Sequence, residues 1–145
     1  MDKRKLVGVM IVIAVMTVSI LGTQNQLVYA KSSGQWYSTA FNGGSKNDPW
    51  GNGVVYSGKI SKSKLVIYGS VSKEKNNGSY RKMKSKKRTY KLSKKCKYYG
   101  RVGDNKLYMS RKDAARQFKD TLKIPAMGFR YKIKKKKVVE IEFTS

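Results

Sequence analysis

The sequence predicts a mainly β domain with one helix, and three observations support this fold class. Two runs of β-branched and aromatic residues, 54–60 and 65–71, flank the turn-forming Ser61-Lys62-Ser63, as in a β-hairpin. Near the C-terminus, two further runs alternate apolar and polar residues around a lysine-rich turn. Only the segment that begins at Ser110 places its apolar residues at helical spacing.

A secretory signal peptide is expected over residues 1–30. Basic residues at positions 3–5 precede an apolar run, 6–21, and Val28 and Ala30 suit the −3 and −1 positions of a cleavage site. The apolar run is shorter than the roughly 20 residues that span a bilayer comfortably. The mature chain would then be secreted or cell-wall associated, cleaved after Ala30 and without a transmembrane span. An uncleaved N-terminal anchor is the alternative.

The segment 31–58 is expected to be a Gly/Asn/aromatic-rich N-terminal segment with short extended pieces. Its run from Asn47 to Gly53 is dense in turn-forming residues, which favours loop structure. We therefore assign the barrel domain to residues 59–145.

Within that domain, the hairpin is followed by strands with lysine-rich outer faces. One or two strands are expected between Ser79 and Tyr99, where apolar residues alternate with lysines, and another around Lys106 to Met109.

The helix is expected from Ser110 to Lys123. Ser110 followed by Asp113 is similar to a capping box, and an acid in the first turn suits the helix dipole. The apolar residues on one side of the helix are Ala114, Ala115, Phe118 and Leu122. Pro125 is expected to end it.

An antiparallel hairpin with one buried face is expected after Gly128. Phe129, Tyr131 and Ile133 would share the buried face with Val139, Ile141 and Phe143. On the outer face three cations would lie opposite Glu140 and Glu142.

The element order is strand, strand, strand, helix, strand, strand, with room for an extra N-terminal strand. This is the order of a small OB-like β-barrel, in which a helix connects the third and fourth strands. Three motifs also resemble the small secreted lysine-rich domains of Gram-positive bacteria over about residues 65–145. They are Leu65-Val66-Ile67-Tyr68-Gly69-Ser70, Thr89-Tyr90-Lys91-Leu92 and Lys137-Val138-Val139-Glu140-Ile141. The resemblance implies fold and location only.

The composition argues against ordinary enzymatic catalysis. The chain has no histidine, which excludes imidazole-based triads and histidine-containing zinc sites. Of the seven acids after residue 30, Asp113 and Asp120 have helix roles and Glu140 and Glu142 have hairpin roles. Three acids remain, in separate predicted loops, so no carboxylate pair for glycoside hydrolysis is expected. We therefore expect a protein that is not an enzyme and uses no metal or other cofactor.

The charge instead predicts binding to polyanions. The chain carries 33 basic and 8 acidic residues, a net charge of +25, and removal of residues 1–30 would take away three basic residues and one acid, leaving +23. Most of the basic residues are lysines, which favour diffuse attraction over sequence-specific recognition. The expected partners are teichoic acids or anionic lipid headgroups, with non-specific nucleic-acid binding as an alternative.

Two basic stretches are the candidate binding surface. The candidates are Arg81, Lys82, Lys84, Lys86, Lys87, Arg88, Lys94 and Lys95 in the first stretch, and Lys134, Lys135, Lys136 and Lys137 in the second. Trp36, Trp50, Tyr80 and Tyr98 are candidate stacking residues. The alternative is that the lysines form a solvated face and the aromatics pack. Convergence of the two stretches on one face would favour a binding site, whereas an even scatter would favour solubility alone.

Two other functions stay open at this stage. A carbohydrate-binding module would use the aromatics of the N-terminal segment to stack on sugar rings. A cationic membrane-active protein would need an amphipathic segment with a broad apolar face. The only cysteine, Cys96, is expected on the same strand face as Tyr98, either buried or available to link two chains.

Overall fold

The computed structural model describes residues 34–145, and the expected signal peptide lies outside the described residues. These residues form a mainly β structure with one helix and a closed six-stranded barrel, which confirms the predicted α+β, OB-like fold class. The strands are β1 (Gln35–Asn42), β2 (Val55–Ile60), β3 (Lys64–Gly69), β4 (Ser72–Glu74), β5 (Tyr80–Lys82), β6 (Lys86–Val102), β7 (Asn105–Met109), β8 (Pro125–Lys134) and β9 (Lys137–Thr144). The helix is α2 (Arg111–Thr121).

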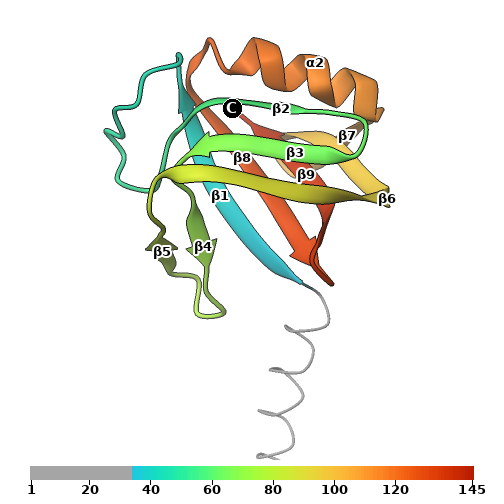
Figure 1. The fold of residues 1–145 in the computed structure, drawn as a ribbon, viewed down its shortest axis with the longest axis horizontal. Helices are drawn as coiled ribbons and strands as arrows, with labels where there is room; N and C mark the ends of the chain where they lie inside the picture. The colour runs from blue at the N-terminus through green and yellow to red at the C-terminus, as the bar shows by residue number, and fades with distance from the viewer. Residues whose placement is uncertain (1–33) are drawn as a thin grey trace, which may run out of the picture. The chain divides into compact units, whose positions relative to one another are not determined.

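The barrel follows the strand order β2-β3-β6-β9-β8-β1 and closes where β1 meets β2 (Figure 1). β6 and β9 run parallel, as do β1 and β2 at the closure between Phe41 and Val55, and the other neighbours are antiparallel. Outside this ring, β4 and β5 extend the sheet from β1, and β7 pairs with β6.

Strand β1 lies within the barrel, although the sequence placed the barrel start at residue 59. It pairs with β8 from Gln35 to Asn42, and the side chain of Phe41 is fully buried. The compact unit accordingly begins at Gly34. Because the residues of β1 between Tyr37 and Phe41 are small or polar, the strand lacks the apolar run that would have marked it in the sequence.

Helix α2 lies across one end of the barrel, next to β2 (Figure 1). Its predicted N-cap is confirmed, because the backbone N–H of Asp113 donates to Oγ of Ser110 at 3.1 Å. Phe118 is fully buried and meets Phe41 and Phe129 edge-on, with ring centroids 5.3 and 5.2 Å apart. The core therefore joins the helix to strands from both ends of the chain.

The predicted C-terminal hairpin is confirmed in β8 and β9, with one correction. Arg130 lies opposite Glu142 and Lys132 opposite Glu140, and both pairs form ion pairs. A register shift after Lys132 turns Val138 into the core, whereas Val139 had been expected there. An irregularity of this kind inserts a residue into one strand and reverses the alternation beyond it.

Candidate functional site

The candidate site begins with an irregularity in the long strand β6. Leu92 pairs with Val138 of β9, and the next paired residue of β6 is Lys97, which pairs with Glu140. β6 therefore advances three residues more than β9 between these pairs, and residues 93–96 bulge away from the ladder. Bulges of this kind re-aim side chains and frequently lie beside functional sites.

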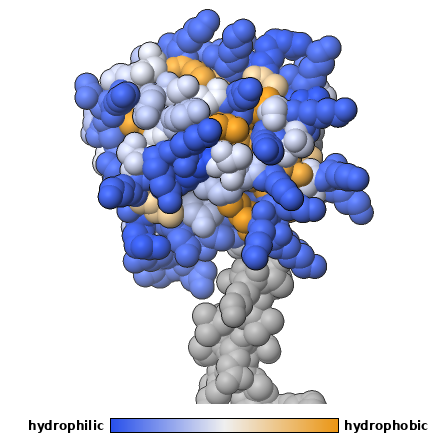
Figure 2. Space-filling model, viewed as in Figure 1, coloured by the Kyte–Doolittle hydropathy of each residue, from blue (hydrophilic) through white to orange (hydrophobic). Residues whose placement is uncertain are grey.

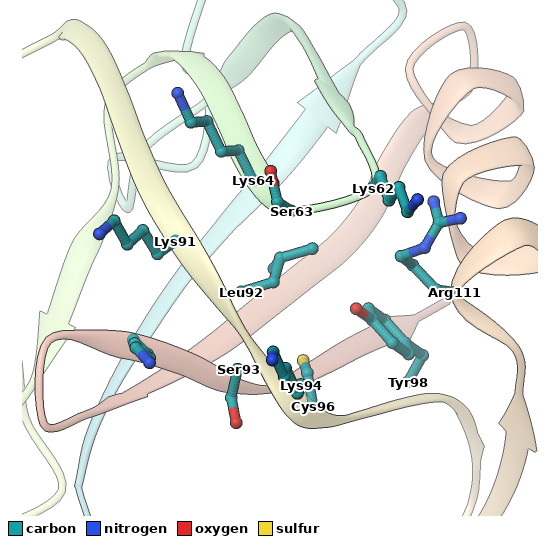
Figure 3. Close-up of a pocket in the computed structure, with 11 residues that line it drawn as sticks. Lys62, Ser63, Lys64, Lys91, Leu92, Ser93, Lys94, Cys96, Tyr98 and Arg111 are labelled. Carbon is teal, nitrogen blue, oxygen red and sulfur yellow. The ribbon is translucent and has the colours of Figure 1, made fainter.

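The bulge opens a pocket of about 600 Å³ between the β2–β3 turn, β6, the start of β9 and the start of α2. Six basic residues line it: Lys62, Lys64, Lys91, Lys94, Arg111 and Lys137. Leu92, Cys96 and Tyr98 add a partly apolar surface, and Ser63 and Ser93 complete the lining. Figure 3 shows Lys62, Arg111 and Tyr98 gathered on the side of α2, with Lys64 and Lys91 on the other side of Leu92.

Three of the pocket lysines also form a row with Lys134 across four strands. Lys64 of β3 pairs with Lys91 of β6, Lys91 with Lys137 of β9, and Lys137 with Lys134 of β8. Like charges directly opposite each other destabilise a sheet. The row is therefore a cost to folding that a bound anion would offset.

No carboxylate of the described residues forms an ion pair with any of the six basic pocket residues, and none lines the pocket. The six cations therefore attract an anion together, because the low-dielectric walls of such a site focus their electric field. Burial raises the pKa of the Tyr98 hydroxyl, which therefore stays protonated and can donate a hydrogen bond to an anion.

The two predicted basic stretches converge only in part. Lys94, Lys134 and Lys137 lie in or beside the pocket region, together with Lys91 from the first stretch. Lys95 is exposed on the same bulge, and Lys135 and Lys136 form the β8–β9 turn with positive φ angles of 52° and 64°.

The beginning of the first stretch lies elsewhere. Arg81 and Lys82 are on β5, which pairs with β4. Lys82 and Lys84 line a separate cavity of about 420 Å³, in which Nζ of Lys82 lies 2.7 Å from Oδ2 of Asp48. Lys86 and Lys87 are exposed at the start of β6, and Nζ of Lys87 lies over the Tyr68 ring at 5.6 Å from its centre. These cations are separate from the pocket.

Arg88, predicted as a binding residue, has a structural role instead. Its side chain is buried and donates hydrogen bonds to the backbone carbonyls of Gly69 at 2.8 Å and Lys84 at 2.6 Å. Because the guanidinium joins β3 to the β5–β6 connection, it is not presented to a ligand.

The four predicted stacking residues do not form a common platform. The Trp36 ring is covered by the guanidinium carbon of Arg130 at 4.2 Å from the ring centre, and Tyr98 is buried. Trp50 and Tyr80 are exposed, but they lie in the β1–β2 loop and on β5, respectively. The structure thus corrects the assignment of Trp36 and Tyr98 as open stacking surfaces.

Sequence reasoning missed Lys62, Lys64, Lys91 and Arg111 as site residues, although Lys91 lies within the first basic stretch. Lys62 and Lys64 belong to the β2–β3 hairpin and Arg111 begins α2, far from either basic stretch. No sequence signal marked them, because their proximity depends on barrel closure and helix docking.

Cys96 is half-buried at the pocket, and burial raises the pKa of its thiol to about 11. Desolvation therefore disfavours the thiolate, although Lys94, Lys95 and Lys97 flank Cys96 in the sequence. We therefore expect iodoacetamide to alkylate native Cys96 at pH 8 about 100-fold more slowly than the urea-unfolded chain, since the thiolate is the nucleophile.

The native alkylation rate should rise roughly tenfold per pH unit until the pH approaches 11. A time course followed by mass spectrometry measures both rates. Equal alkylation rates for the native and the unfolded chain at pH 8 would contradict burial of the Cys96 thiol.

Among residues 34–145, no group of three or more cysteine and acidic side chains is placed to hold a metal ion. No helix of the described residues is both long and apolar enough to cross a membrane. Comparison with known protein families, characterised proteins and solved structures finds no match to this chain.

Proposed function

We propose that the protein is a secreted, non-enzymatic binding protein that associates electrostatically with cell-envelope polyanions, such as teichoic acid or anionic lipid. The observation that carries the proposal is the lysine row Lys64, Lys91, Lys137 and Lys134, of which the first three also line the pocket with its six cations. The surface around β3 and β6 supports it, since hydrophilic side chains cover most of the face that Figure 2 shows.

The dimensions of the row favour a ligand with several anionic groups. Neighbouring strands lie about 4.8 Å apart, so four strands place the outer lysines about 14 Å apart. A single phosphate group would leave most of the charge of such a row unpaired, whereas a polymer or an array of headgroups can pair with all four lysines. Lysine binds phosphate as a flexible, hydrated point charge, which suits a partner without one defined geometry.

The carbohydrate-binding alternative receives less support from the structure. Trp36 is covered by Arg130, Tyr37 stacks on Tyr131 with ring centroids 5.3 Å apart, and Tyr56 packs near Tyr68. The aromatics of the N-terminal segment thus mainly pack against the barrel. A helix-based membrane-active function is also disfavoured, because the apolar side of α2 packs into the core.

Chromatography on immobilised polyphosphate tests the proposal with charge-matched variants. The variant Lys64→Gln/Lys91→Gln/Lys137→Gln removes three members of the lysine row, and Lys112→Gln/Lys119→Gln/Lys123→Gln removes three exposed lysines on and after α2. We expect wild-type protein to bind at low salt and to elute below roughly 0.5 M salt, because salt screens surface attraction.

The row variant should elute at clearly lower salt. The slope of log binding constant against log salt should fall in magnitude by about 2, since fewer phosphate contacts form and fewer counterions are released. The α2 variant should stay close to wild type. Equal shifts for the two variants would show that net charge alone governs binding. Absence of wild-type retention at low salt would reject the proposed function, and the same assay on isolated cell walls checks the natural surface.

A further inference from the structure

The hairpin formed by β6 and β7 exposes apolar side chains that the core does not use. Val102 is 62% exposed and Leu107 is 59% exposed. Neither is among the residues that pack on the hydrophobic core. Both side chains lie near the tip of one hairpin, in a chain with a net charge of +25.

The strand register connects these side chains to the pocket. Tyr98 pairs with Met109, Gly100 with Leu107, and Val102 with Asn105. Directly opposed residues share a face of the sheet and alternate residues return to it, so Val102 and Leu107 share a face with Tyr98 and Met109. Because Tyr98 lines the pocket, this face of the hairpin begins at the cationic site and continues to Val102 near the hairpin tip.

The opposite face of the same hairpin carries cations and aromatic rings, and Tyr108 on this face is 62% exposed. The Tyr108 ring lies 5.4 Å from the Tyr99 ring, Nζ of Lys106 lies over Tyr99 at 4.8 Å, and Arg101 pairs with Glu142. The hairpin is therefore amphipathic, with cations on one face and exposed aliphatic side chains on the other.

We propose that the cationic pocket and the face of Val102 and Leu107 dock together on an anionic phospholipid bilayer. The headgroup phosphates would lie against the six pocket cations, and the two aliphatic side chains would enter the interface between headgroups and acyl chains. A soluble polyanion would use the cations but would leave the two aliphatic side chains in water. The inference rests on the proposed function, because it uses the same cations, and it specifies the bilayer as the partner.

Vesicle flotation tests this inference with protein that is expressed from the full chain and purified in its exported form. The probes are phosphatidylglycerol/phosphatidylcholine vesicles and pure phosphatidylcholine vesicles, each at low salt and at roughly 0.5 M salt, where electrostatic binding is screened. The variant is Val102→Ser/Leu107→Ser, and the matched control is Ile124→Ser, an exposed aliphatic residue between α2 and β8.

We expect wild-type protein and Ile124→Ser to bind phosphatidylglycerol vesicles and to stay partly bound at high salt. Val102→Ser/Leu107→Ser should bind at least about tenfold more weakly and be released by salt, since burial of each aliphatic side chain favours membrane association. Its retention on polyphosphate and its thermal unfolding should match wild type, because both substituted side chains are exposed.

Several outcomes would overturn the inference. Identical vesicle binding by wild type and the double variant, with polyphosphate retention intact, would assign the site to a soluble polyanion only. Equal binding to pure phosphatidylcholine would remove the role of the cations. A wild-type dimer that the double variant abolishes, measured by light scattering, would assign the hairpin face to a second copy of the chain. Loss of wild-type polyphosphate retention at low salt would instead reject the proposed function itself.

Discussion

The substitution Phe118→Ala is expected to lower the free energy of unfolding by about 3–5 kcal/mol. Phe118 is fully buried, and its ring meets Phe41 of β1 and Phe129 of β8 edge-on. Truncation removes both aromatic contacts and leaves a cavity under α2, which the closed barrel cannot easily fill. Urea unfolding followed by circular dichroism measures the change.

Lys119→Ala is the matched control for this substitution, because Lys119 is the next residue of α2 and is exposed. It should change stability by less than about 0.5 kcal/mol. A domain of this size has about 5–15 kcal/mol of stability, so Phe118→Ala can leave little folded protein. Phe118→Leu then serves as the milder variant. If neither Phe118 variant measurably lowers the free energy of unfolding, the docked position of the helix is contradicted.

The second large effect is expected for Arg130→Met. Arg130 joins two carboxylates: its Nε and Nη2 lie 2.9 and 3.0 Å from the oxygens of Glu74, and its Nη1 lies 3.1 Å from Oε1 of Glu142. The side chain of Glu142 is only 2% exposed. Among the described residues, removal of Arg130 leaves the buried Glu142 carboxylate with only the longer 3.4 Å contact to Arg101, and a poorly compensated buried charge of this kind costs about 3 kcal/mol.

A double-substitution cycle tests this explanation. Arg130→Met/Glu142→Gln should recover a large part of the lost stability, because it also removes the poorly compensated carboxylate. Arg116→Met is the control, since Arg116 pairs with Asp113 at 2.9 Å in an exposed site, and the expected loss there is below about 1 kcal/mol. Equal losses for Arg130→Met and Arg116→Met, measured by urea unfolding, would contradict the special role of the buried pair.

Local patterns in the sequence predicted most of the fold. The capped helix at Ser110, the hairpin around residues 61–63 and the terminal hairpin with its opposed charges all occur, the last with Val138 buried in place of Val139. Each of these features depends on residues close together in the chain, where apolar periodicity and turn chemistry act directly. The sequence left room for an extra N-terminal strand but did not place β1 in the barrel, because its pairing partner, β8, lies about 90 residues further along the chain.

The candidate site was predicted less completely than the fold. The lysines of 134–137 were identified as a cluster because they are adjacent in sequence. The pocket also needs Lys62, Lys64 and Arg111, and their proximity depends on the β6 bulge and on the docking of α2. Arg88 shows the opposite error, since its neighbours in the sequence are exposed lysines and its own side chain is buried.

The sequence by itself determined that this chain is strongly basic, lacks histidine and folds mainly as strands with one capped helix. Charge is a property of composition, and strand and helix patterns act over a few residues, so both can be read without a structure. The tertiary structure decided which cations meet. Strand register places Lys64, Lys91, Lys137 and Lys134 side by side, and such register arises only when distant strands pair around a common core.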